Sequence, residues 1–434
     1  MDGFAVPPWM DIRTAAEEDT ITGCEVGIQH GGIIRERHEN GNTAGPQNGI
    51  VISAVDQQIP LVVTECRSYD NTRCLHAFAL LNRSGEMLDR EYGIPAKNRV
   101  RSEKMQIGEM KHGPSNLITD VPGVKVGHCT VDRGENHTGV TVVIPCPENP
   151  YTHKLTAASF VLNGFGKTAG LLQIDELGTL ETPIALTNTL NVGLVHDAVV
   201  GYMIERSARE GITVRSVNPV VCECNDGGIN CIQKRAVGEK EVLQAIENAS
   251  EEFAQGAVGA GRGTVCYGLK GGIGSSSRTM EIDGHTYTLG VLVQSNYGAS
   301  RDLRLTEIPQ NIQETDQGSI ILIVATDLPL SSRQLKRVIK RTSVGMARLG
   351  SYIGHGSGEV MVGFTTARPT VISPHVYAYP VLEESQLNAA FRAAGEAAEE
   401  AIIHSMLYAD EDRTLDGKQI GSLRKLLMEQ QEGK

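Results

Sequence analysis

The sequence predicts a layered α/β fold in which helices cover packed β-sheets. From residue 101 onward, β-branched runs of strand length and amphipathic runs of helix length follow one another along the chain. With 434 residues, of which 40% are hydrophobic, the chain can bury a sizeable core in one large or two moderate domains. Its 48 glycines and its aromatic content of 4% are typical of a tightly packed, turn-rich α/β protein.

Several short segments are predicted as strands because they are rich in β-branched residues and bounded by turn residues. One pair forms a hairpin, since Asp283-Gly284 lies between two β-prone runs and Asp-Gly favours a two-residue hairpin turn. The predicted strands are residues 140–145, 159–162, 183–188, 217–224, the hairpin 275–294, and 319–326.

Longer segments with apolar residues at helical spacing are predicted as helices. These are residues 194–209, 240–254, 332–348 and 387–408. In the last of them an apolar stripe predicts one buried face, formed by Phe391, Ala394, Ala398, Ile402 and Met406.

Residues 1–100 are expected to form an N-terminal extension to a domain that spans residues 101–434. Within the extension, residues 23–37 and 49–65 are typical of strands and residues 71–81 of a helix. Basic and polar residues at 95–111 predict a linker. A small α/β domain, a regulatory attachment and an oligomer contact are all compatible with this region, which carries no motif that we can identify.

The most informative motif is LKGGIGSSSR at residues 269–278. A glycine-rich loop that opens a helix can bind phosphate through its backbone N–H groups, and kinases of the galactokinase/homoserine kinase group carry a similar Gly-Leu-Gly-Ser-Ser loop. Here a predicted strand follows, and the chain has no Gly-x-x-x-x-Gly-Lys-Ser/Thr loop, so phosphate binding is disfavoured. A glycine-rich turn without chemistry is a second interpretation.

Self-cleavage between Gly274 and Ser275 is a third interpretation of this motif. A serine hydroxyl is a weak nucleophile that needs a base. As a new N-terminus, Ser275 would carry its own base, because an α-amine has a pKa near ~7.7–8. Gly274 favours the first step, since a residue without Cβ lets the hydroxyl approach its carbonyl. Cleavage would leave two chains, 1–274 and 275–434.

A set of motifs in fixed order accompanies this one. They are NLITDVPGV (116–124), VGH (126–128), TGVT (138–141), LNGFGKTAG (162–170), NDG (225–227), GVLVQSNYG (290–298), ATD (325–327) and GHGSG (354–358). Each is weak alone, but as an ordered set they are specific. With them, the chain from about residue 101 to its end resembles the DmpA/BapA family of N-terminal-nucleophile peptidases, the L-aminopeptidase/D-esterase and β-peptidyl aminopeptidase group.

This resemblance implies an αββα sandwich and an enzyme that first cleaves itself. It implies a serine aminopeptidase or amidase that releases N-terminal residues from short peptides, amides or esters through an acyl-enzyme. By motif position, Ser275 would be the nucleophile and Gly274 the residue before the cut. Asn225 would donate a hydrogen bond to the oxyanion, a role that suits a side-chain amide. The resemblance also implies a homo-oligomer of cleaved αβ units.

Three further residues are weaker site candidates. Asp327, in the ATD motif, would pair with the new ammonium group, Tyr151 would lie near the site, and Asn296 would shape it. Simpler interpretations remain for these and for Asn225, which stands in a turn-forming Asn-Asp-Gly-Gly sequence. Asp327 could cap or turn the chain, and Tyr151 could be a half-buried ring. Lys167 could lie near the pocket and disfavour cationic substrate ends.

Two other functions stay open at this point. One is an acyltransferase of the ornithine acetyltransferase type, which also cleaves itself but uses a threonine, so a serine at position 275 favours the peptidase. The other is a non-catalytic family member that serves in binding or assembly.

Composition excludes some classes of partner. The formal net charge of −12 argues against a nucleic-acid surface. No segment has the length and hydrophobicity of a signal peptide or membrane span, and the nine cysteines show no disulfide framework, so we expect a cytoplasmic protein with reduced thiols. The Cys-x-Cys spacing of Cys222 and Cys224 is not that of a zinc site, and neither a metal nor a cofactor is expected.

Overall fold

The computed structural model describes residues 107–306 and 316–432, and in the region before them it describes strands alone. The chain divides into two compact units, Met1–Met105 and Gln106–Lys434. The strands of the first unit are β1 (Glu25–Gln29), β2 (Ile33–Arg37), β3 (Ile50–Ser53), β4 (Val62–Arg67), β5 (Arg73–Cys74), β6 (Leu80–Leu81) and β7 (Met87–Leu88). The prediction of a helix at residues 71–81 is wrong for the part of this segment that the structure describes. That part consists of strands β5 and β6.

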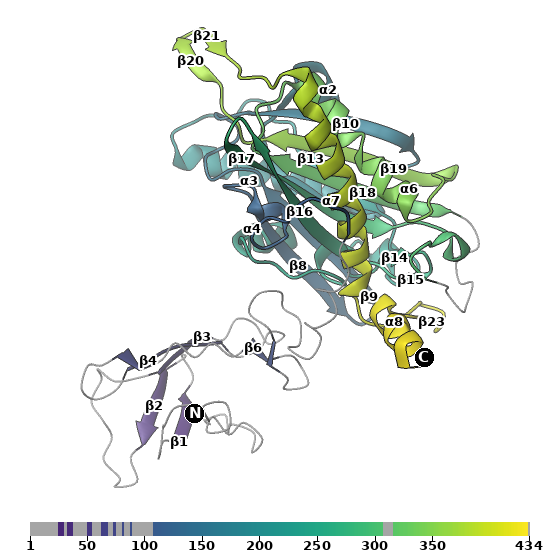
Figure 1. Cartoon of the computed structure of the whole chain (residues 1–434). Coiled ribbons are helices and arrows are strands. Elements are labelled where there is room, and N and C mark those ends of the chain that lie inside the picture. The colour runs from purple at the N-terminus through teal and green to yellow at the C-terminus, as the bar shows by residue number, and fades with distance from the viewer. Residues whose placement is uncertain are drawn as a thin grey trace. The chain divides into compact units, whose positions relative to one another are not determined.

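Two sheets form the centre of the second unit (Figure 1). The six-stranded sheet has the spatial order β11 (Thr179–Leu180), β10 (Leu155–Gly164), β19 (Gly356–Thr365), β18 (Gln317–Thr326), β17 (His285–Asn296) and β16 (Ile273–Ile282). The four-stranded sheet has the order β13 (Val220–Cys224), β12 (Ile184–Asn188), β9 (Asn136–Ile144) and β8 (Lys125–Arg133). β18 is a nearly unbroken buried apolar run, as expected of a strand covered on both faces.

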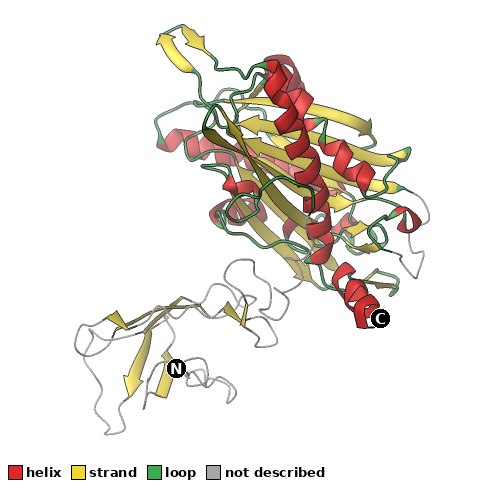
Figure 2. Cartoon of the chain, viewed as in Figure 1, coloured by secondary structure: helices red, strands yellow, loops and turns green. Residues whose placement is uncertain are grey.

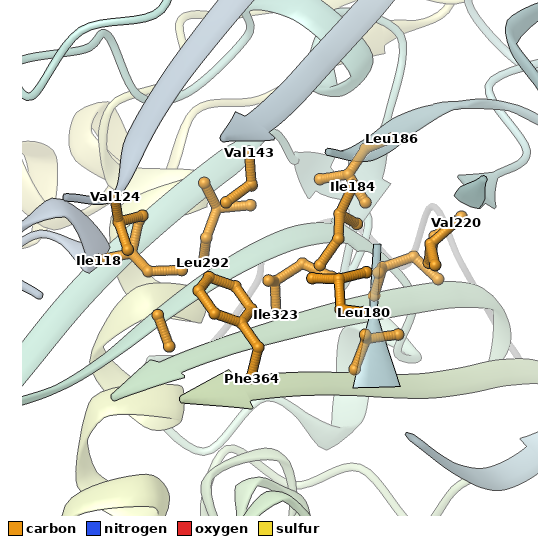
Figure 3. Close-up of a cluster of buried hydrophobic side chains, with 14 of the residues drawn as sticks. Ile118, Val124, Val143, Leu180, Ile184, Leu186, Val220, Leu292, Ile323 and Phe364 are labelled. Carbon is orange, nitrogen blue, oxygen red and sulfur yellow. The ribbon is translucent and has the colours of Figure 1, made fainter. Parts of the chain in front are cut away.

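The hydrophobic core lies between the two sheets (Figure 3). Leu292, Ile323 and Phe364 extend from the six-stranded sheet toward Val143 and Ile184 of the four-stranded sheet, and all five side chains are fully buried. Apolar side chains on one face of each sheet thus cover each other, which is the main reason why the two sheets pack.

Helices cover the outer faces of both sheets (Figure 2). The helices of this unit are α2 (Leu171–Leu177), α3 (Val192–Arg209), α4 (Glu239–Glu247), α5 (Ser332–Ile339), α6 (Thr342–Arg348), α7 (Leu387–Leu407) and α8 (Leu423–Glu432), of which α6 and α8 pack on α7. Helix α7 packs on β16 and β17, α5 on β10 and β19, and α3 and α4 on the four-stranded sheet. The predicted αββα sandwich is confirmed. The single helix expected at 332–348 is two helices, α5 and α6.

The predicted hairpin is formed by β16 and β17. Asp283 and Gly284 have φ values of 50° and 75°, the left-handed conformations that a tight two-residue hairpin turn requires. Gly274 lies in β16 under α7, where a Cβ would come within 1.9 Å of the carbonyl oxygen of Ala401. A glycine there lets the helix approach the strand closely. Three further small hairpins are β14–β15 (Val265–Cys266, Leu269–Lys270), β20–β21 (Thr370–Ser373, Val376–Ala378) and β22–β23 (Asp412–Arg413, Gln419–Ile420).

Strand directions bring several chain segments to one edge of the six-stranded sheet. This edge is formed by the ends of strands and not by an outer strand. β18 runs parallel to β19 and antiparallel to β17, so the starts of β18 and β19 lie beside the end of β17. The end of β13, in the other sheet, reaches the same place, because the Cys224 thiol donates to the carbonyl of Ser319 at 3.3 Å. This edge holds the polar cluster described next.

Candidate active site

Ser319 stands near the start of β18, between two strands. It pairs with Asn296, the last residue of β17, and with Gly358 in β19. The preceding residue, Gly318, has a φ of +105°, and a Cβ on it would come within 1.9 Å of the carbonyl oxygen of Asn296. Only glycine fits this backbone conformation and this space. A serine is thus presented directly after an obligatory glycine, at the edge of the sheet.

The Ser319 side chain is 5% exposed. Among the described residues no hydrogen bond engages its hydroxyl. Its Oγ lies beside the neighbouring backbone, since a Cβ at Gly358 would be 3.1 Å from it. The hydroxyl is therefore almost enclosed. It is not committed to a structural hydrogen bond, and this second property is the one that a nucleophile requires.

Asn225 directly follows β13 and is exposed. Its Oδ1 accepts a hydrogen bond from the backbone N–H of Gly227 at 2.9 Å, which leaves the Nδ2 group as the available donor. Its carbonyl accepts from Nδ2 of Asn296 at 2.9 Å. The Oδ1 of Asn296 in turn accepts from the N–H of Val265 at 2.9 Å. Asn296 pairs with Ser319 through the ladder and holds the backbone of Asn225 through its side chain. It thus fixes Asn225 next to Ser319.

Ser357 and Glu359 lie at the start of β19, on either side of Gly358. The Ser357 hydroxyl donates to Oε1 of Glu359, and Ser357 pairs with Gly318 across the ladder. The Glu359 side chain is fully buried, and its Oε2 has no hydrogen-bond partner among the described residues. Burial, followed by the nearby charge of Asp316, raises the pKa of this carboxyl to about 7. A buried acid with a raised pKa beside a cluster of polar groups is a candidate for a functional site.

The segment after β10 lies against the same edge. The backbone N–H of Lys167 donates to Oε1 of the buried Glu223 at 2.9 Å, and the Thr189 hydroxyl donates to the other carboxylate oxygen. The Lys167 ammonium lies 4.9 Å from the ring centroid of Phe165, which is 56% exposed. The backbone of Lys167 therefore lies beside the end of β13, directly before Asn225.

A comparison with known protein families shows which family the chain belongs to. Residues 116–420 match Peptidase family S58. The chain belongs to peptidase family S58. It is therefore a peptidase, in a family whose typical nucleophile is a serine.

Relatives of this S58 chain have named activities. The beta-peptidyl aminopeptidase BapA of Sphingosinicella microcystinivorans is 36% identical over 334 residues, covering 69% of this chain and 83% of the relative. The protein of the same name from Sphingosinicella xenopeptidilytica is 34% identical over 331 residues, covering 69% and 82%.

Solved structures agree with the S58 assignment. The PH0078 protein of Pyrococcus horikoshii OT3 is 42% identical with a TM-score of 0.70, covering 76% of this chain and 97% of that one. A Burkholderia sp. beta-aminopeptidase is 36% identical with a TM-score of 0.69, covering 77% and 98%. The L-aminopeptidase D-Ala-esterase/amidase of Ochrobactrum anthropi, described as a variant of the Ntn-hydrolase fold, is 32% identical with a TM-score of 0.67, covering 75% and 96%. The S58 chain shares this Ntn-hydrolase fold.

The structure does not bring Ser275 together with Asn225 and Asn296. Ser275 lies within β16, is fully buried and pairs with Leu292, four residues before Asn296. Four residues of strand separate positions by about 13 Å. Its hydroxyl is also committed, since it accepts from the N–H of Ile118 at 2.7 Å and donates to the carbonyl of Val291 at 2.8 Å.

The serine run after Gly274 has a structural role in this S58 fold. Ser276 donates to Glu400 of α7 at 2.7 Å, and Ser277 donates to Asp120 at 2.6 Å. The fully buried Arg278 forms ion pairs with Glu400 at 2.7 Å and Glu396 at 3.4 Å. These side chains connect β16 to α7 and to the segment before β8. The motif that suggested catalysis is therefore a buried polar network.

Lys270, in the same motif, is also structural. Its fully buried ammonium donates to the carbonyls of Gly261, Thr264 and Gly271 at 3.2, 2.9 and 2.8 Å. Burial is the main reason why its pKa falls to about 7. The lysine thus holds the loop that leads to Val265 through these hydrogen bonds. The N–H of Val265 in turn donates to Asn296.

Two weaker candidates lie away from this edge. Asp327 follows the far end of β18 and accepts from the N–H of Thr288 at 2.7 Å, so it is bound to the neighbouring strand β17, and burial raises its pKa. Tyr151 packs against the core under α3, beyond the opposite end of β9, with Lys154 5.8 Å from its ring. Neither residue reaches Asn225 or Ser275 in the structure.

Sequence reasoning did not select Ser319, Ser357 or Glu359, although local signals existed. Gly318-Ser319 opens the predicted strand 319–326, and the GHGSG motif contains Ser357. Nothing local separated Gly318-Ser319 from Gly274-Ser275, because both pairs begin a β-prone run. Among the described residues, no cluster of His, Cys, Asp or Glu could hold a metal ion. No helix in the described ranges is long and apolar enough to cross a membrane.

Proposed function

We propose that this chain is a self-processing aminopeptidase whose nucleophile is Ser319, formed by cleavage between Gly318 and Ser319. One observation carries this proposal: the uncommitted Ser319 hydroxyl lies at the edge where Asn296 and Glu359 also lie. Ser275 meets none of these conditions, since both hydrogen-bonding functions of its hydroxyl are used inside the core.

Self-cleavage begins when Oγ of Ser319 attacks the carbonyl carbon of Gly318. The new C–O bond replaces the C–N bond, and the hydroxyl proton passes to the departing amine of Ser319. Water then hydrolyses the ester, which leaves a carboxylate on Gly318 and a free amine and hydroxyl on Ser319. Gly318 has a positive φ and no Cβ, so no side chain of its own stands between its carbonyl and the attacking hydroxyl.

Peptide hydrolysis uses the groups that cleavage creates. The Ser319 amine takes the hydroxyl proton as Oγ attacks the substrate carbonyl, and it returns a proton to the leaving amine as the C–N bond breaks. Water then hydrolyses the ester on Oγ, which releases the acyl group as an acid and restores the hydroxyl. The Nδ2 group of Asn225 donates to the developing oxyanion, because its Oδ1 is held by Gly227. Glu359, with a pKa of about 7, exchanges protons in the working pH range and is connected to the site through Ser357.

The substrates we propose are short peptides, amides or esters with a free N-terminal amine, in line with the names of the relatives. We also propose a homo-oligomer of cleaved αβ units in the cytoplasm. The described cysteines are free thiols, which is typical of a reducing compartment. The net charge of −12 gives no support for nucleic-acid binding.

An intact-mass spectrum of the purified protein tests this proposal. We expect two chains, with the smaller beginning at Ser319. Ser319→Ala should give one uncut chain of about 46.7 kDa and no hydrolysis of an aminoacyl p-nitroanilide.

Ser275→Ala is the matched control. It leaves the Ile118 N–H unpaired and should cost about 1–3 kcal/mol of stability, but the protein should still be cut at Gly318. A smaller chain that begins at Ser275 would overturn the assignment of Ser319. An uncut wild-type protein would overturn self-processing.

A further inference from the structure

Asp316 lies just before the proposed scissile bond, and its side chain is 3% exposed. Its carboxylate accepts three hydrogen bonds. Oδ1 accepts from the N–H of Gly298 at 3.1 Å, and Oδ2 accepts from the Ser351 hydroxyl at 3.0 Å and the N–H of Gly354 at 3.3 Å. Three donors hold this side chain in one place on the acyl side of the bond.

The three donors come from both sides of the proposed cut. Gly298 follows β17 and belongs to the fragment that ends at Gly318. Ser351 and Gly354 lie between α6 and β19, in the fragment that begins at Ser319. Asp316 therefore connects the end of one fragment to the body of the other, at the point where the chain would be cut.

We propose that Asp316 is a positioning residue for self-cleavage, holding the Gly318 carbonyl within reach of the Ser319 hydroxyl. This inference rests on the proposed function of Ser319. Fixing two reacting groups in a productive geometry can accelerate an intramolecular attack by orders of magnitude. β18 begins at Gln317 and is held by both neighbouring strands, so the sheet ladder already positions Ser319. Asp316 adds a restraint on the acyl side of the bond.

Asp316 also acts on the buried acid of the site. Its charge raises the pKa of Glu359, in addition to the larger effect of burial, whereas the Ser357 hydroxyl lowers it. The other titratable groups that the Asp316 charge affects are Cys266, Tyr267 and Tyr297, all with raised pKa values. Removing the charge should lower the pKa of Glu359, which a purely mechanical restraint would not do.

Asp316→Asn tests the proposal in the full chain. After cell-free synthesis, the uncut fraction is followed by intact mass, and hydrolysis by the fully cut protein is followed against pH. We expect self-cleavage to slow at least tenfold. We also expect the acidic midpoint of the pH profile to move to lower pH, because Glu359 ionises more easily. Asp175→Asn, on the exposed face of α2, is the matched control and should change neither quantity.

Ser351→Ala is the second variant, in case Asp316→Asn does not fold. It removes one of the three donors and leaves the charge, so cleavage should slow a few-fold with no change in the pH midpoint. A wild-type cleavage rate in Asp316→Asn would overturn the inference. Slower cleavage with an unchanged pH midpoint, in proportion to lost thermal stability, would also overturn it. If wild-type protein is cut elsewhere or not at all, the proposed function fails instead.

Discussion

Asn296 and Ser319 lie opposite each other across β17 and β18, and Nδ2 of Asn296 donates a 2.9 Å hydrogen bond to the carbonyl of Asn225. One side chain thus connects the proposed nucleophile to the proposed oxyanion donor, which comes from the other sheet. The proposed active site depends on this contact between the two sheets.

Asn225→Ala should slow hydrolysis by roughly 10²–10³, the usual cost of removing one oxyanion donor. Stability should change little, because the side chain is exposed. Steady-state kinetics on the cut protein measure the loss, which should be mainly in kcat. An unchanged kcat would remove Asn225 from the mechanism.

Asn296→Ala should have a smaller effect on kcat, on the order of tenfold, because Asn296 positions Asn225 and does not itself touch the reacting atoms. It also leaves the Val265 N–H and the Asn225 carbonyl without partners, which should cost about 1–3 kcal/mol of stability. The double variant with Asn225→Ala gives the decisive comparison. Its kcat should equal that of Asn225→Ala alone, and additive losses would contradict a positioning role.

Gly318→Ala should prevent or strongly slow self-cleavage. A Cβ there meets the Asn296 carbonyl oxygen at 1.9 Å, and the φ of +105° is unfavourable for alanine. Gly417→Ala is the control, because Gly417 has a φ of +84° but no atom within 4 Å of its Cβ position. The uncut fraction by gel or mass should be high only in the first variant; rapid cutting of Gly318→Ala contradicts the proposed scissile bond.

Glu359→Gln should change stability in a pH-dependent way. The folded pKa of about 7 is above the unfolded value near 4.5, so the folded wild type gains stability from protonation at low pH and loses it as pH rises through 7. Relative to wild type, the variant should be more stable at pH 8, by on the order of 2–3 kcal/mol, and about equal at pH 4. Urea unfolding of the variant and the wild type at both pH values measures this difference in unfolding free energy. An equal difference at the two pH values would contradict the ionisation of a buried Glu359. Hydrolysis should fall sharply.

Arg278→Met should destabilise the protein by about 3–5 kcal/mol, because it leaves Glu396 and Glu400 buried without their cation. The pKa of Glu400 lies well below its usual range, since a His112 hydrogen bond and the charges of His404 and Arg278 outweigh the opposing effect of burial. Arg348→Met removes an exposed pair with Glu399 and should cost under about 1 kcal/mol. Activity per folded molecule should persist in both variants. A loss of this activity in Arg278→Met alone would indicate that the serine run takes part in catalysis.

Strands and helices were largely predictable, because their signals are local. The Asp283-Gly284 turn, the β-branched run of β18 and the apolar stripe of α7 each carry their information within a few residues. The break between α5 and α6 had no such signal, and the extent of helix 240–254 was overestimated, since α4 ends at Glu247. The ordered motifs identified the family for the same reason.

By itself, the sequence determined the αββα fold, the S58 family and a Gly-Ser bond as the expected point of chemistry. Only the tertiary structure distinguished the two Gly-Ser pairs. The hydroxyl of Ser275 is bonded by Ile118 and Val291, whereas that of Ser319 is uncommitted beside Asn296 and Gly358. These partners are distant in sequence, and whether a hydroxyl stabilises the core or can attack a carbonyl depends on which of them the fold brings to it.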